Sequence, residues 1–185
     1  MPRTLAFTIA ALLGGSISNP LAAQVAVIPT TQPPPKAGDV ATLDGIMKAY
    51  YDVVSGPVGS LPDPTRDQSL HHPNAQVTLL DRKADGTATV AVITLAEYYR
   101  RGGLGPRKRG FFEHEIHRVT EQIGSLAHVW STYESAETPG GKSFSRGINS
   151  IQLYWDGHRW WVLGWVFDDE RAGNRVPPKY LPVPH

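Results

Sequence analysis

The chain has 185 residues, of which 18 are lysine or arginine and 17 are aspartate or glutamate, and it has no cysteine. This length favours one domain with tails, and the balanced charge argues against nucleic acid as a partner because polyanion binding needs clustered cations. The lack of cysteine excludes disulfides, thiolate metal ligands and thiol nucleophiles.

The first 23 residues have the three-part plan of a secretory signal peptide. Arg3 lies near the start, an apolar stretch runs from Leu5 to Leu13, and small residues lead to Ala23. The apolar stretch is shorter than the roughly 20 residues that a membrane-spanning helix needs. We therefore expect an exported protein, periplasmic or secreted, without a membrane anchor. The alternative is a buried N-terminal helix.

Prolines divide the remaining chain into three parts. Residues 24–41 are predicted to be a proline-rich linker, residues 42–170 the folded domain, and residues 171–185 a second proline-rich segment. We expect this last segment to be extended, either against the domain or free in solvent.

Three helices and a hairpin are predicted in the first half of the domain. Apolar residues recur on one helical face over 43–54, and Pro64 after Asp63 is typical of the start of a short helix that ends before Pro73. Strands over 75–80 and 87–93 flank an Asp-Gly turn, which favours a hairpin. A capping-box pattern then begins a third helix at residue 94, which ends at residue 102.

Four longer runs of strand-forming residues follow, with short connections between them. They are residues 111–121, 127–134, 147–154 and 159–167. Short connections favour an antiparallel, strongly bent sheet. The order of the elements therefore predicts an α+β fold in which helices cover one face of a curled sheet.

This order resembles the nuclear transport factor 2-like superfamily, which includes ketosteroid isomerases, scytalone dehydratases and polyketide cyclases. The segments 70–75, before the first strand, and 155–161, between the last two strands, carry the resemblance, which covers residues 42–169. Three more segments are similar to an uncharacterised exported branch of the superfamily: 110–113, 127–134 and 146–153. The resemblance implies a single cone-shaped domain whose open end forms an apolar pocket.

Glu113, Glu115 and His117 alternate along one predicted strand and are expected to share a face of the sheet. If that face lines the cone, Glu115 and His117 are candidates for general acid and base chemistry. If the face is solvated, the three residues form a polar stripe. A third interpretation is an ion pair between Arg146 and one of the two glutamates.

The histidines of the chain raise the alternatives of metal binding and helix capping. His114 and His117 are three residues apart, which does not fit the zinc-protease helix, and a site made of Glu113, His117 and His128 is an alternative that we do not favour. We expect no metal and no cofactor. His71 lies at the end of a predicted helix, where we expect it to cap the helix.

The catalytic residues of the ketosteroid isomerases are only partly present in this sequence. The resemblance implies a base at the position of Leu79, which cannot accept a proton, and an oxyanion-donating tyrosine near Tyr50, which also lies on the apolar stripe of its helix. The Asp/His pair of scytalone dehydratases has only Glu115 and His117 as loose substitutes.

Five tryptophans lie in the last three strands and their connections: Trp130, Trp155, Trp160, Trp161 and Trp165. Such residues line pockets for flat apolar molecules and also build cores and interfaces. Alternation along the last strand places Trp160 and Trp165 on opposite faces, so both faces are expected to be apolar. We therefore predict a homodimer that covers the outer face.

The sequence thus favours binding of a small apolar or aromatic molecule in the cone pocket. The expected contact residues are Tyr50, Glu113, Trp130, Arg146, Gln152 and Trp165. One alternative is a cofactor-free acid/base lyase or isomerase that uses Glu115 or His117. A second alternative is a protein-interaction module that uses the face of the sheet.

Overall fold

The structure is a computed structural model that describes residues 28, 31–83, 85–102 and 104–183. The predicted signal peptide, residues 1–23, lies outside the described residues, and export stays a prediction. Among the residues that the structure describes, no helix is long and apolar enough to cross a membrane.

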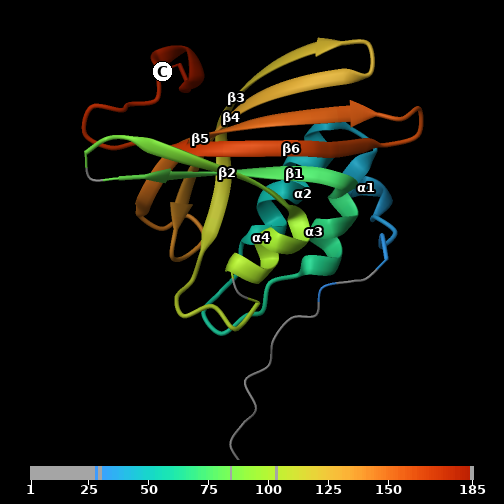
Figure 1. Ribbon diagram of the computed structural model, residues 1–185, viewed down its shortest axis with the longest axis horizontal. Helices are drawn as coiled ribbons and strands as arrows, with labels where there is room; N and C mark the ends of the chain where they lie inside the picture. Colours follow the sequence, from blue (N-terminus) through green and yellow to red (C-terminus); the bar gives the residue numbers. More distant parts are fainter. Residues whose placement is uncertain (1–27, 29–30, 84, 103, 184–185) are drawn as a thin grey trace, which may run out of the picture.

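Six strands form one sheet in the order β2-β1-β6-β5-β4-β3 (Figure 1). The strands are β1 (His71–Arg82), β2 (Ala88–Thr94), β3 (Phe112–Ile123), β4 (Leu126–Ala136), β5 (Ser143–Trp155) and β6 (Trp160–Asp169). The helices are α1 (Ala37–Val40), α2 (Leu43–Val54), α3 (Pro64–Leu70), α4 (Leu95–Gly102) and the 3₁₀ turn η1 (Pro178–Tyr180). The predicted α+β class is confirmed.

One pair of strands corrects the expectation of an antiparallel sheet. β1 and β6 run parallel, with Val77 opposite Trp165, whereas the other neighbours are antiparallel. Short connections enforce antiparallel pairing only between strands that follow each other in the chain. β1 and β6 are far apart in sequence, so no hairpin fixes their relative direction.

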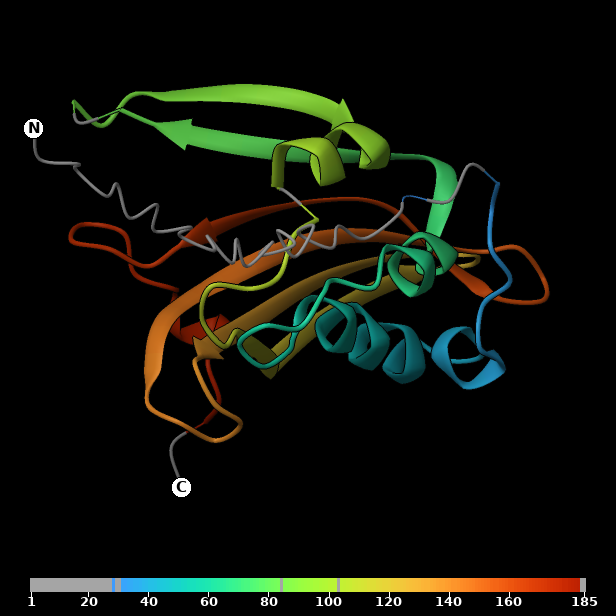
Figure 2. The same ribbon diagram turned by 90° about the horizontal axis from the view of Figure 1, so that it is seen from below.

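The sheet curls around α2 and α3, which lie on its concave side (Figure 2). We call this side of the sheet the inner face and the opposite side the outer face. Apolar side chains of α2, among them Ile46 and Met47, pack with Val129, Ile151 and Leu153 of the sheet, and all five are almost completely buried. Their burial is the main apolar contribution to stability.

Arg107 holds the loop between α4 and β3 against the end of α2. Its guanidinium donates hydrogen bonds to the carbonyl oxygen of Val54 (3.0 Å), to Ser60 Oγ (2.8 Å) and to the carbonyl oxygen of Leu61 (3.1 Å). A cation is favourable there because the last carbonyl groups of a helix carry partial negative charge. The loop therefore delivers Phe111 to a fixed position beside α2.

Both proline-rich segments contact the domain in their described parts. Gln32 Nε2 donates to the carbonyl oxygens of Gln68 (2.8 Å) and His71 (3.1 Å) at the end of α3. On the outer face, Thr132 Oγ1 donates to the carbonyl oxygen of Tyr180 (2.5 Å). The C-terminal segment thus covers part of β4.

A bulge in β6 changes which tryptophans share a face. The register with β5 shifts between Gln152 and Leu153, and Leu163 has no partner in β5. The extra residue reverses the alternation of side chains. Trp160 and Trp165 therefore both pack in the core, and the prediction that they lie on opposite faces is wrong. The homodimer, which was inferred from that alternation, stays a prediction.

A chain of buried hydrogen bonds joins α2 to the sheet. Asn149 Nδ2 donates to Tyr51 Oη (3.1 Å), Tyr51 Oη lies 2.6 Å from Ser131 Oγ, and Ser131 donates to Glu115. Polar groups in a core are costly unless they are paired, so the chain fixes α2 over β4 and β5.

Tyr51→Phe should lower the free energy of unfolding by about 1–3 kcal/mol, because Ser131 and Asn149 lose a buried partner. The matched control is Tyr50→Phe, whose hydroxyl has no hydrogen-bond partner among the described residues and whose loss should stay near 0.5 kcal/mol. Urea denaturation measures both values. Equal losses would show that the hydrogen-bond chain does not stabilise the fold.

Candidate functional site

A cavity of about 260 Å³ lies at the end of the sheet where β3 and β5 begin and β4 and β6 end. We call it the aromatic cavity because of its walls, which come from the end of α2, from α4, and from these strands. The aromatic residues that line it are Tyr50, Tyr98, Phe111, Tyr133, Phe144, Trp165 and Phe167. Seven rings around one small space make its surface mainly apolar.

Trp165 forms the centre of this wall. Tyr98 meets it edge to face at 5.0 Å between ring centroids, and Tyr50 does so at 6.3 Å. The indole N–H of Trp165 donates to His71 Nε2 (3.2 Å), and His71 Nδ1 donates to the carbonyl oxygen of Asp67 (2.8 Å). Because Nε2 accepts, the imidazole is neutral, and His71 caps α3 without charge.

Two carboxyl groups line the cavity, one from β3 and one from β6, with β4 and β5 between these strands. Glu113 of β3 accepts a hydrogen bond from Ser135 Oγ of β4 (3.0 Å). Asp169 of β6 accepts from Tyr133 Oη (2.6 Å) and from Ser145 Oγ (3.2 Å). All the donors are neutral hydroxyl groups, so the carboxyl groups are hydrogen-bonded without receiving a counter-charge.

Gly147 allows Tyr133 to reach Asp169. A Cβ atom at position 147 would lie 2.4 Å from Tyr133 Oη and 2.7 Å from the carbonyl oxygen of Asp168. Neither distance is possible without displacement, and the second involves backbone. A residue without a side chain at this point of β5 therefore lets the tyrosine ring cross the strand.

Burial raises the pKa of Glu113 to about 7, and the nearby negative charge of Asp169 adds to the effect, although the hydrogen bond from Ser135 opposes it. Burial also raises the pKa of Tyr98 to about 12 and that of Tyr50 well above its usual range, so both hydroxyls remain protonated. Neither hydroxyl has a hydrogen-bond partner among the described residues. The cavity thus offers two free donors and one carboxyl group that titrates near neutrality.

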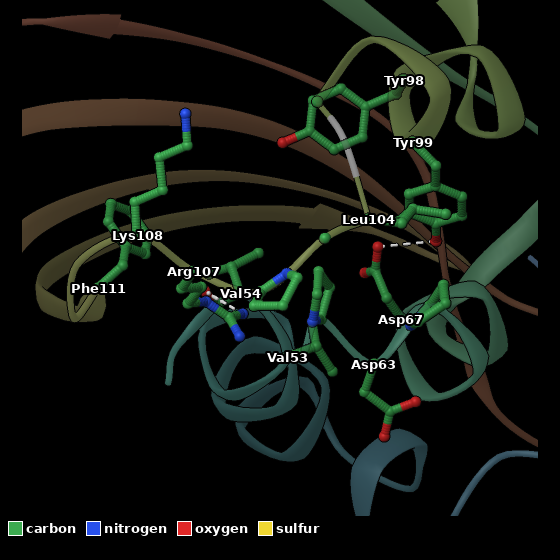
Figure 3. Close-up of a pocket in the computed structure, with 15 residues that line it drawn as sticks. Val53, Val54, Asp63, Asp67, Tyr98, Tyr99, Leu104, Arg107, Lys108 and Phe111 are labelled. Carbon is green, nitrogen blue, oxygen red and sulfur yellow. Dashed lines mark hydrogen bonds between the residues drawn. The ribbon is translucent and has the colours of Figure 1, made fainter. Parts of the chain in front are cut away.

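A second cavity of about 540 Å³ lies beside the loop between α4 and β3, and we call it the loop cavity (Figure 3). It shares Val54, Asp67, Tyr98 and Phe111 with the aromatic cavity. Asp67, one of its carboxylates, accepts a hydrogen bond from Tyr99 Oη (2.8 Å). The guanidinium group of Arg107 already donates hydrogen bonds to backbone carbonyl oxygens. The charged groups of the loop cavity serve mainly in folding, so the aromatic cavity is the better candidate site.

Three of the residues predicted from the sequence meet in the aromatic cavity: Tyr50, Glu113 and Trp165. Trp130 lies on the outer face, where its ring is 5.4 Å from Tyr180, and Gln152 is exposed. These two residues do not line the cavity to which the sequence assigned them.

Arg146 also does not line the cavity. Its guanidinium pairs with Glu170 (2.8 Å) and lies 3.8 Å from Glu134, so the predicted ion pair with Glu113 or Glu115 is wrong. Arg146 is opposite Glu134 in the β4–β5 register, and cross-strand partners share a face of the sheet. That face is the outer one.

A bulge in β3 separates the predicted stripe. Glu115 is opposite Tyr133 but His117 is opposite Thr132, so the register shifts between them. Glu113 and Glu115 share the inner face, whereas His117 shares the outer face with Thr132. The prediction that all three share a face is wrong, and Glu115 and His117 cannot act together. Glu115 pairs instead with Arg118 (2.7 Å).

The alternative of a metal site at Glu113, His117 and His128 is not supported by this geometry, because Glu113 and His117 lie on opposite faces. Within the described part of the chain, no group of three or more histidine, aspartate or glutamate side chains is arranged to hold a metal ion.

Several residues of the aromatic cavity were not predicted from the sequence, above all Asp169, Tyr98 and Asn149. Asp169 is the last residue of β6, and β6 ends beside the start of β3 at the same end of the sheet. Comparing which strand ends meet at the open end of the cone would have pointed to it. No pattern in the sequence distinguishes Tyr98 from Tyr99, which packs in the core.

The order of the elements along the chain, with helices on one face of a curled sheet, is the one that the sequence predicts. The chain has a nuclear transport factor 2-like fold. No family model matches the sequence, and no curated protein matches it. Among solved structures, an NTF2-like protein of unknown function from Shewanella baltica OS155 is 13% identical, with a TM-score of 0.41 over 70% of this chain and 98% of that one. A likeness this low adds nothing about function.

The raised pKa of Glu113 predicts a pH-dependent stability. The folded protein, with a pKa of about 7 against the ordinary 4.5, binds this proton more tightly than the unfolded chain. The free energy of unfolding therefore falls as the pH rises from about 4.5 to about 7. Glu113→Gln, measured by urea denaturation at pH 5 to 8, should gain stability relative to the wild type as the pH rises, by on the order of 3 kcal/mol.

The control for this titration is Glu115→Gln, which loses the ion pair with Arg118 and should be less stable than the wild type over the same range. A stability difference between Glu113→Gln and the wild type that does not change with pH would contradict the raised pKa.

Proposed function

We propose that the protein binds a small, mainly apolar molecule in the aromatic cavity. The observation that carries this proposal is the combination of an aromatic wall with free polar groups, the hydroxyls of Tyr50 and Tyr98 and the carboxyl group of Glu113. A few polar groups that converge in an apolar hollow are typical of ligand sites. This keeps the function that the sequence favours and replaces half of the expected contacts.

The free hydroxyls support a ligand rather than a simple packing defect. Tyr50 is only 7% exposed, yet its hydroxyl has no partner among the described residues. The hydroxyl is not one of the completely buried unpaired atoms of the described residues, so water or the acceptor atom of a bound molecule can reach it. The volume of about 260 Å³ lies just below the usual range of ligand pockets and suits a molecule of one or two rings.

Filling the cavity tests the proposal. Val54 lines the cavity at the end of α2, and Val54→Trp places a large side chain there. We expect the wild type to bind indole and 2-naphthol, measured by saturation-transfer NMR and calorimetry, and Val54→Trp to bind them at least tenfold more weakly. The matched control is Val58→Trp at a position that is 67% exposed, which should bind like the wild type.

If neither probe binds to the wild type, or if Val54→Trp binds both probes unchanged, the aromatic cavity is not a ligand site. Circular dichroism of both tryptophan variants shows whether they retain the fold, so that a loss of binding is attributed to filling of the cavity.

A second candidate function is proton transfer, as in a cofactor-free isomerase or lyase. It is favoured by the pKa of Glu113 near 7, because a carboxyl group that titrates near neutrality serves well as a general base. Glu113 would take a proton from the carbon next to a carbonyl group, and Tyr50 would donate to the oxygen that becomes negative. Glu113 thus replaces Glu115 and His117 as the candidate base.

Exchange of the α-protons of 2-tetralone in D₂O, followed by NMR, tests this second function. We expect the protein to accelerate exchange, Glu113→Gln to abolish the acceleration, and Tyr50→Phe to reduce it by about 10²-fold or more. A wild-type rate equal to that of buffer, or full activity of Glu113→Gln, would remove the isomerase candidate and leave binding alone.

A further inference from the structure

The carboxyl groups around the aromatic cavity differ from the other half-buried carboxylates of the protein. Four of those each have an arginine within 2.8 Å: Asp39 with Arg66, Glu115 with Arg118, Asp168 with Arg82, and Glu170 with Arg146. By contrast, no ion pair joins Glu113 or Asp169 to a lysine or arginine in the described part of the chain. Among the half-buried carboxylates of the described residues, those without a lysine or arginine partner all line the aromatic cavity: Asp67, Glu113 and Asp169.

We propose that the molecule bound in the aromatic cavity is an organic cation, an amine or ammonium group on an apolar or aromatic body. This inference rests on the proposed binding function and names its ligand class. Glu113, Asp169 and Asp67 line the cavity, and no lysine or arginine is among the residues that line it. A cationic ligand supplies the missing counter-charge in surroundings where Coulomb attraction is stronger than in water.

The aromatic rings of the cavity also favour a cationic ligand. The faces of aromatic rings attract cations, and a cage of several rings is a common way to bind a substituted ammonium group. Seven aromatic residues surround the cavity, and Tyr50, Tyr98 and Trp165 meet edge to face, so their rings present surfaces in different directions. The body of the ligand would contact these rings while its charged nitrogen lies near the carboxyl groups.

Arg109 and Lys108 do not supply this counter-charge from within the cavity. Arg109 lies over the ring of Phe144 at 4.5 Å and is 3.6 Å from Glu137, and it does not line the cavity. Lys108 lines the neighbouring loop cavity instead. When Glu113 is ionised, it repels an anionic ligand and attracts a cationic one, whereas a neutral ligand experiences neither effect.

Three probes of similar size and different charge test the inference at pH 8, where Glu113 is ionised. They are 2-phenylethylamine, which is cationic, 2-phenylethanol, which is neutral, and phenylacetate, which is anionic. We expect calorimetry to show the amine binding at least tenfold more tightly than the alcohol, and phenylacetate binding more weakly than both. The indole N–H signal of Trp165, assigned with Trp165→Phe, shows whether a probe enters the aromatic cavity.

Charge-removing variants separate attraction to the carboxyl groups from attraction to the rings. Glu113→Gln and Asp169→Asn should each reduce the preference for the amine over the alcohol at least threefold. The matched control is Glu134→Gln on the outer face, which should keep the full preference.

The outcomes distinguish the inference from the function on which it rests. If the alcohol or phenylacetate binds in the cavity as tightly as the amine, the cation inference is wrong and small-molecule binding stands. If the amine is preferred equally in Glu113→Gln, Asp169→Asn and the wild type, the carboxyl groups do not recognise it and the inference is also wrong. If none of the three probes binds by calorimetry and none shifts the Trp165 signal, the inference and the proposed function both fail.

Discussion

The helix in the hollow of the sheet is too short to fill it. α2 has 12 residues and spans about 18 Å, whereas β5 has 13 residues and spans about 43 Å. α2 therefore covers only part of the inner face. The end that it leaves uncovered is the one where β3 and β5 begin and β4 and β6 end, and the aromatic cavity lies there.

This geometry sets the chemistry of the site. Rings shield the side chains at this end of the sheet from bulk water, and α2 reaches the cavity only with Tyr50 and Val54 at its end. Glu113 and Asp169 lie in this intermediate environment with hydroxyl donors only, and so the proton affinity of Glu113 rises. A cavity that is apolar, acidic and free of built-in cations is a consequence of one short helix on a long, curled sheet.

The sequence was sufficient for the elements and insufficient for the faces. Periodicity and capping patterns predicted α2, α3, α4 and all six strands, because these signals are local. The bulges after Glu115 and at Leu163 come from pairing between strands and leave no mark in the alternation of residues. The sequence therefore placed His117 on the face of Glu113 and Glu115, and Trp160 and Trp165 on opposite faces, and both predictions are wrong. The role of Asp169 depended on a register that sequence alone does not fix.

The most direct test of this account is the titration of Glu113 in the ligand-free protein. Carbon-detected NMR of protein labelled with ¹³C-glutamate follows each side-chain carboxyl group, and Glu113→Gln assigns the signal. We predict that the Glu113 signal titrates near pH 7, above the ordinary 4.5. A pKa near 4.5 would show that Glu113 is solvated or has a counter-charge, and would contradict the acidic, water-poor cavity on which the account is built.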